Sequence, residues 1–124
     1  MSNKFKVYAT CHIGEAAENL LRERGYKLEI YPGPEAPPKK LIMEKVSSGI
    51  DGLITTLRDP IDAEVLKREK GTLKVVVSGR DGFDKINRAD ANRYKVPFTN
   101  TAEVLNDATA EFTFLMTGTL SRRM

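Results

Sequence analysis

The stretch LKVVVSGRDGFD, residues 73–84, decides the fold that we predict for this chain. Val75, Val76 and Val77 are β-branched and follow one another without a polar interruption. Such a run is typical of a strand that is buried on both faces of a parallel sheet. Residues 78–82 then bring two glycines and three polar residues, which predicts a tight loop at the C-terminal end of the strand. Ligands bind at that edge of open α/β sheets, so this loop is the first candidate site.

The composition indicates one domain with a real core, since 40% of the 124 residues are hydrophobic. The net charge of +3 is small, and the lysines and arginines are scattered among 17 acids, which argues against nucleic-acid binding. Cys11 is the only cysteine, so an internal disulfide is impossible. No apolar run approaches a membrane span, and the N-terminus lacks the apolar block of a signal peptide. We therefore expect a cytoplasmic protein that does not contact a membrane.

Strands and helices alternate along the chain. The patterns predict strands over residues 4–9, 26–31, 52–56, 73–77 and 96–99, and helices over 14–24, 38–47, 62–69, 86–94 and from 102 to 122 or 123. This alternation predicts an α/β fold with a parallel sheet, right-handed crossovers and helices on both faces. For five strands we expect a flavodoxin-like three-layer α/β/α arrangement with the order 2-1-3-4-5 and a long C-terminal helix. The residues of the first helix expected to face the sheet are Ala16, Ala17, Leu20 and Leu21.

The predicted topology brings four loops to one edge of the sheet, namely residues 10–13, 56–59, 78–82 and 100–102. The bend at 78–82 offers several backbone N–H groups, whose clustered dipoles can hold an anion. It lacks the GxxxxGK[ST] spacing of a P-loop and is no dinucleotide fingerprint either. An ordinary strand-to-helix turn accounts for the same residues, and both interpretations remain open. Asp81 would repel an anion, whereas Arg80 would either hold a carboxylate or pair with Asp81 or Asp84.

Cys11 and His12 lie together at the same edge, and His12 is the only histidine. A Cys–His pair suits nucleophilic catalysis, but adjacent side chains usually point apart and no third member of a triad is apparent. This favours a small buried thiol beside a surface imidazole, and one His with one Cys argues against a zinc site. Near the start of the last helix, Asn106, Asp107 and Thr109 are placed to cap the helix or to approach a ligand.

Four segments together resemble the D-isomer-specific 2-hydroxyacid dehydrogenases, and the glyoxylate and hydroxypyruvate reductases in particular. They are GPEAPP (33–38), DGLITTLRDPIDAEVL (51–66), LKVVVSGRDGFDKIN (73–87) and VPFTNTAEVLNDATAEFTFLMTGTLSRR (96–123). The segments cover essentially the whole chain and keep the order of the family. The resemblance implies a flavodoxin-like substrate-binding domain over residues 1–101, followed by an interdomain helix over 102–124 that leads towards a nucleotide-binding domain.

The resemblance also implies a substrate, which is a small 2-keto or 2-hydroxy acid such as glyoxylate or hydroxypyruvate. In the family, backbone N–H groups of the loop after the fourth strand hold the substrate carboxylate, at a Val-Gly pair that precedes an aromatic residue and an Asp. The matching pair here is Asp81 and Gly82, ahead of residues 83–84. The loop that lines the substrate pocket matches Thr56 and Leu57. The predicted substrate-binding residues are Thr56, Leu57, Ser78, Asp81 and Gly82.

The cofactor implied by the resemblance is NAD(P), and Thr109 matches a threonine that approaches its phosphates or nicotinamide. Two positions depart from the family: Asp81 replaces a small apolar residue, and Ala102 stands where proline or serine is common. The family's Gly-rich dinucleotide fingerprint, its catalytic arginine, glutamate and histidine, and a C-terminal helix that completes the substrate domain all come after Met124. We therefore carry over no catalytic residue and expect NAD(P) not to bind well to these residues alone.

Two classes of function remain open after this comparison. One is the substrate-binding domain of a dehydrogenase, incomplete as a catalyst on its own. The other is a stand-alone flavodoxin-like scaffold or binding module without enzymatic activity.

The last helix predicts association, because its apolar residues leave no clean polar stripe. Phe112 and Phe114 lie about 200° apart around a helix, so one face of a sheet cannot cover both. We expect a homodimer or a swapped assembly whose interface includes residues 102–122. The alternative is that the helix folds back onto its own sheet or frays.

Overall fold

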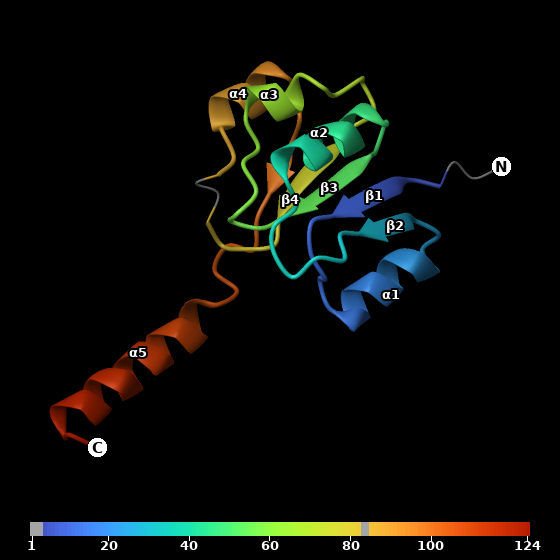
Figure 1. The fold of residues 1–124 in the computed structure, drawn as a ribbon. Coiled ribbons are helices and arrows are strands. Elements are labelled where there is room, and N and C mark those ends of the chain that lie inside the picture. Colours follow the sequence, from blue (N-terminus) through green and yellow to red (C-terminus); the bar gives the residue numbers. More distant parts are fainter. Residues whose placement is uncertain (1–3, 83–84) are drawn as a thin grey trace.

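The five predicted strands form one parallel sheet in the computed structural model of the chain, which describes residues 4–82 and 85–124 (Figure 1). The strands are β1 (Lys6–Ala9), β2 (Lys27–Ile30), β3 (Gly52–Thr55), β4 (Val75–Ser78) and β5 (Phe98–Thr99). Their order is β2-β1-β3-β4-β5 and all their pairings are parallel. The α/β class and the order 2-1-3-4-5 are thus confirmed.

The helices are distributed unevenly around this sheet. They are α1 (Glu15–Glu23), α2 (Lys39–Ser47), α3 (Ala63–Leu66), α4 (Arg88–Arg93) and α5 (Asn106–Ser121). Figure 1 shows α2, α3 and α4 together on one side, α1 on the other, and α5 extending away from the sheet. The long C-terminal helix is therefore confirmed. None of the described helices combines the length and the apolar character needed to span a bilayer.

The hydrophobic core lies on the side of α2 and α3. Tyr8, Leu53 and Val76 are neighbours across three strands, and each is almost fully buried. They belong to one cluster with residues from the inner faces of α2 and α3, which are Ile42, Val46, Val65 and Leu66. Successive side chains of a strand point to opposite faces. One face of each central strand therefore supplies most of the core.

The opposite face of the sheet is only partly covered. Val75 and Val77 of β4 are half-buried, so the expectation that this strand is buried on both faces is wrong. The cause is that α1 packs against β2, at the far edge of the sheet from β4. The expected inner face of α1 is also wrong, because α1 has no buried residue and Leu20 is 50% exposed.

The last helix starts later than the sequence pattern predicts. Residues 102–105 form turns, and α5 begins at Asn106 instead of Ala102. Glu103 has a φ of 68°, in the left-handed region that a right-handed helix does not contain. The chain therefore changes direction here before the helix starts.

We predict that Leu53→Ala destabilises the protein by about 2–5 kcal/mol, because Leu53 is fully buried between α2, α3 and the neighbouring strands. Leu20→Ala is the matched control and should cost less than about 0.5 kcal/mol, since Leu20 is half-exposed on α1. Urea unfolding followed by circular dichroism gives both values. Equal losses from the two substitutions would contradict a core on the α2 side.

Candidate functional site

The C-terminal ends of the strands place the predicted site residues at one edge of the sheet. Thr56 and Leu57 follow β3 directly, and Ser78 is the last residue of β4. Because β3 and β4 are adjacent and parallel, with Thr55 opposite Ser78, the two loops start side by side. Parallel pairing therefore produces the ligand edge that the sequence predicts.

A buried carboxylate holds the β3 loop against the end of β1. Asp59 Oδ2 accepts hydrogen bonds from Thr10 Oγ1 at 2.6 Å, from the Thr56 backbone N–H at 2.7 Å and from Thr56 Oγ1 at 3.0 Å. Asp59 and Thr10 are each 1% exposed. The Oδ1 atom of Asp59 has no hydrogen-bond partner among the described residues. These bonds fix the position of Thr56, and with it the course of the predicted substrate loop.

Asp59 is not among the site residues predicted from the sequence. Its partner Thr10 is 49 positions away, so no local pattern predicts their contact. The sequence does contain a weak indication of the bond between Thr56 and Asp59, because these two residues flank a predicted turn and Pro60 follows. Asp and Thr side chains in such a turn commonly bond to nearby backbone groups.

The loop after β4 is shaped by its own hydrogen bonds. Ser78 is buried, and its hydroxyl donates to the Gly82 carbonyl at 3.2 Å. The Gly79 N–H donates to the Thr55 carbonyl at 2.8 Å. The Arg80 carbonyl accepts from Thr101 N–H, and the Asp81 carbonyl accepts from the Asn100 side-chain amide.

These bonds leave a specific set of donors in the loop. The backbone N–H groups of Arg80, Asp81 and Gly82 have no acceptor among the described residues, whereas that of Gly79 is already bonded. Of the predicted anion-binding bend at residues 78–82, these three consecutive N–H groups are therefore the donors that remain for a ligand. Phe83 and Asp84, which match the family's aromatic residue and Asp, lie outside the described residues.

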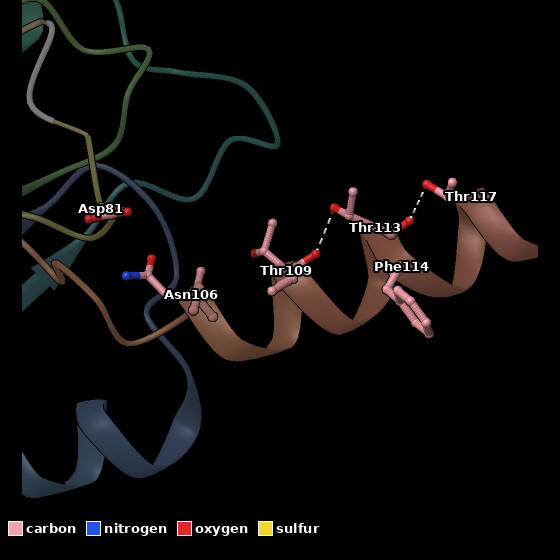
Figure 2. A pocket seen from close by; sticks show the side chains of 8 residues that line it. Asp81, Asn106, Thr109, Thr113, Phe114 and Thr117 are labelled. Atoms are coloured by element: carbon pink, nitrogen blue, oxygen red, sulfur yellow. Dashed lines mark hydrogen bonds between the residues drawn. The ribbon is translucent and has the colours of Figure 1, made fainter.

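A groove of about 740 Å³ lies along α5 and reaches Asp81 of the β4 loop. Figure 2 shows side chains that line it. Its lining residues are Asp81, Leu105, Asn106, Thr109, Ala110, Thr113, Phe114 and Thr117. The structure thus brings together Asp81, predicted for substrate, and Thr109, predicted for cofactor. Thr56, Leu57, Ser78 and Gly82 are not among the lining residues, although they belong to the same edge.

The threonines along the groove differ in what their hydroxyls do. Thr113 Oγ1 donates to the Thr109 carbonyl, and Thr117 Oγ1 donates to the Thr113 carbonyl, both at 2.8 Å (Figure 2). The Thr109 hydroxyl has no hydrogen-bond partner within residues 4–82 and 85–124. Of the three hydroxyls, that of Thr109 is therefore the one available to a ligand.

The charged groups of this edge do not neutralise one another. Neither Arg80 nor Asp81 forms an ion pair with any described residue, and Asp84 lies outside that range. The predicted pairing of Arg80 with Asp81 is therefore wrong. The alternative pairing of Arg80 with Asp84 stays a prediction, and among the described residues neither Arg80 nor Asp81 has an ion-pair partner.

Cys11 and His12 do not form a nucleophilic pair. Burial raises the pKa of the Cys11 thiol and the Asp59 carboxylate raises it further, whereas the guanidinium groups of Arg58 and Arg80 lower it. The net rise disfavours the thiolate, which is the nucleophilic form. His12 is exposed, and its Nδ1 contacts Glu18 Oε1 at 3.1 Å. Within the described part of the chain, no three His, Cys, Asp or Glu side chains are grouped to hold a metal.

The residues present do not complete a dinucleotide site. Thr109 and the groove offer a hydroxyl and an apolar wall beside it, but none of the loops after the strands contains GxGxxG. That sequence lets a backbone approach a pyrophosphate at a helix N-terminus. These residues therefore supply at most one side of a cofactor site.

Comparison with known proteins places the whole chain in one group. The family model for the catalytic domain of D-isomer specific 2-hydroxyacid dehydrogenases matches residues 7–124. A glyoxylate reductase from Thermococcus litoralis is 34% identical over 121 residues, which are 98% of this chain and 36% of that protein. The chain thus spans about a third of the length of the curated relatives that it matches.

Solved structures share the fold of this chain. A protein from Thermus thermophilus has a TM-score of 0.85 and 36% identity, over 96% of this chain and 37% of its own. An NAD+-bound 3-phosphoglycerate dehydrogenase from Entamoeba histolytica has a TM-score of 0.62 and 23% identity, over 79% and 33% of the two chains. At that identity the second likeness concerns the fold alone.

We predict that Thr10→Val destabilises the protein by about 1.5–3 kcal/mol, because it removes a donor to a buried carboxylate. Thr10→Ser keeps the hydroxyl and serves as the control, with a markedly smaller loss. Urea unfolding measures both free energies. If the valine and serine variants prove equally stable, the bond from Thr10 to Asp59 does not hold the two strand ends together.

Proposed function

Because this chain belongs to the D-isomer-specific 2-hydroxyacid dehydrogenases and matches their catalytic domain, we propose that it binds the substrate of such an enzyme. The candidate substrate is a small 2-keto acid such as glyoxylate or hydroxypyruvate, and the names of the relatives, which are glyoxylate reductases, support this class. The observation that carries the proposal is the β4 loop, whose N–H groups at Arg80, Asp81 and Gly82 are free of described acceptors beside the groove. A cytoplasmic location and the absence of nucleic-acid partners stay predictions from the sequence.

Each loop has its own role in this proposal. The three N–H groups of the β4 loop bind the carboxylate of the acid, since clustered N–H dipoles favour negative charge. Ser78 supports them by holding the Gly82 carbonyl. Thr56 and Leu57 line the other side of the substrate, on a loop that Asp59 fixes in place.

The cofactor belongs on the α5 side of the groove. The Thr109 hydroxyl faces the NAD(P) phosphates or nicotinamide there. When bound, NAD(P)H supplies the hydride for reduction of the keto group. The 124 residues contain no dinucleotide fingerprint, so we expect them to bind substrate without completing the reaction.

A second candidate function is a flavodoxin-like scaffold or binding module without enzymatic activity. The observation that favours it is Asp81, an acid in the loop that would otherwise hold a carboxylate. Binding of a small acid at residues 80–82 distinguishes the two candidate functions, because only the substrate-binding domain is expected to bind such an acid at this loop.

We predict binding without turnover. Oxalate, an unreactive analogue of a small 2-keto acid, should shift the NMR amide signals of Arg80, Asp81 and Gly82 and leave Gly79 less affected, since its N–H already bonds to Thr55. Glyoxylate with NADPH should show no loss of NADPH absorbance above background. Amide signals that do not move at millimolar oxalate would argue for the scaffold, and measurable turnover would show that these residues are catalytically complete.

We also propose that the chain forms a homodimer through α5. All sixteen residues of this helix are exposed, and its large apolar side chains include Phe112, Phe114, Leu115, Met116 and Leu120. On the order of several hundred Å² of apolar surface meets water, at about 25 cal/mol per Å². A second copy that covers this surface would remove the penalty.

Sedimentation equilibrium at micromolar concentration should give twice the 13.9 kDa of one chain. Phe112→Glu together with Phe114→Glu should return it to the monomer, because both side chains would place charges in the interface. Leu20→Glu is the control, since Leu20 is exposed on α1 and should leave the dimer intact. A monomeric wild-type protein would refute the dimer, and a dimer that survives both phenylalanine substitutions would refute the interface.

A further inference from the structure

Among the described residues, no contact of the Asp81 side chain explains why an acid stands in the β4 loop. Its carboxylate accepts no hydrogen bond and forms no ion pair within the described residues. It does not cap α5 either, because the N-cap of that helix is Leu105 and no side chain caps it. Asp81 instead lines the groove, where Figure 2 shows its side chain near Asn106 at the start of α5.

The β4 loop, which borders the groove at Asp81, therefore has two opposite preferences for the charge of a ligand. The N–H groups of residues 80–82 favour an anion, and the Arg80 side chain beside them is unpaired among the described residues. The Asp81 carboxylate disfavours an anion and favours a cation. A plain 2-keto acid satisfies the first preference and violates the second.

A zwitterion satisfies both preferences. Its carboxylate can occupy the N–H groups while a protonated nitrogen two bonds away lies against Asp81. The groove lining also holds polar groups that can accept hydrogen bonds, namely the Asn106 amide oxygen and the Thr109 hydroxyl. A hydroxyl or carbonyl oxygen at this position would gain nothing from the Asp81 charge.

We propose that Asp81 makes the site selective for small acids that carry a protonated nitrogen beside the carboxylate, as 2-amino and 2-imino acids do. Asp81 would then set this chain apart from the glyoxylate reductases among its relatives, because 2-keto and 2-hydroxy acids of the same size bind less tightly to the site. This inference rests on the proposed function, because it takes the loop at residues 80–82 as the place where the substrate carboxylate binds.

Glycine and glycolate are a matched pair for the test, since they differ only in an ammonium group against a hydroxyl. Each is titrated at neutral pH into the 124-residue chain, and the amide shifts of Arg80, Gly82 and Thr109 give its Kd. Glycine should bind roughly two- to fivefold more tightly than glycolate, the range expected for an exposed ion pair. Asp81→Asn should abolish this preference by weakening glycine and strengthening glycolate.

The control variant is Asp107→Asn, which removes one negative charge from the first turn of α5 without touching the groove lining. It should leave the preference for glycine as in the wild type. Amide signals outside residues 78–82 report whether each variant keeps the fold.

The possible outcomes separate the two proposals. If glycolate binds as well as glycine to the wild type, or if Asp81→Asn leaves the preference unchanged, the inference about Asp81 is overturned and the proposed function stands. The same holds if Asp107→Asn abolishes the preference equally well. If neither ligand moves these amides in any of the proteins, the proposed function falls together with the inference.

Discussion

The buried Asp59 carboxylate is the constraint on which the ligand edge depends. A charge that is removed from water must be satisfied by hydrogen bonds, and Asp59 obtains them from two different strand ends. Thr10 follows β1 and Thr56 follows β3, so the carboxylate meets both only when the strands pair in the observed register. The two bonds from Thr56 shape the loop after β3, and the bond from Thr10 ties that loop to the end of β1.

The hydrophobic core that supports the ligand edge lies mainly on one face of the sheet. Tyr8, Leu53 and Val76 are sealed by α2 and α3, while Val75 and Val77 on the other face remain half-buried. The rigidity of the ligand edge thus comes mainly from the α2 side. The shape of the β4 loop also depends on a buried residue, because Ser78 at the end of β4 is buried and its hydroxyl donates to the Gly82 carbonyl.

The architecture was predictable because local patterns in the sequence indicate its strands and helices. The valine run at residues 75–77 and the alternation of strands with helices were enough for the parallel sheet and its order. The burial of each strand face was not predictable, since it depends on where a helix lies in space: α1 sits over β2 and leaves β4 open. The left-handed conformation of Glu103 likewise has no sequence signal that would place the start of α5 at Asn106.

The candidate site likewise has features that the sequence predicts and features that it does not. The position of the loops followed from topology, and the resemblance to the family supplied Asp81 and Thr109, which the structure brings to one groove. The Thr10–Asp59 bond joins residues 49 positions apart, and no pattern of neighbours could have found it. Nor could the sequence tell that the Gly79 N–H is already bonded, because its partner lies on the adjacent strand.

The threonines of α5 have a thermodynamic consequence for this groove. Thr113, Thr117 and Thr119 each bond to a carbonyl of their own helix, and β-branched residues form helices reluctantly. A sixteen-residue helix of this kind is marginal in water, so its order depends on what packs against it. One wall of the groove is this same helix. A partner that packs on α5 therefore stabilises the ordered helix, and so does a ligand that binds in the groove. Each of these binding events raises the population of ordered helix and thereby favours the other.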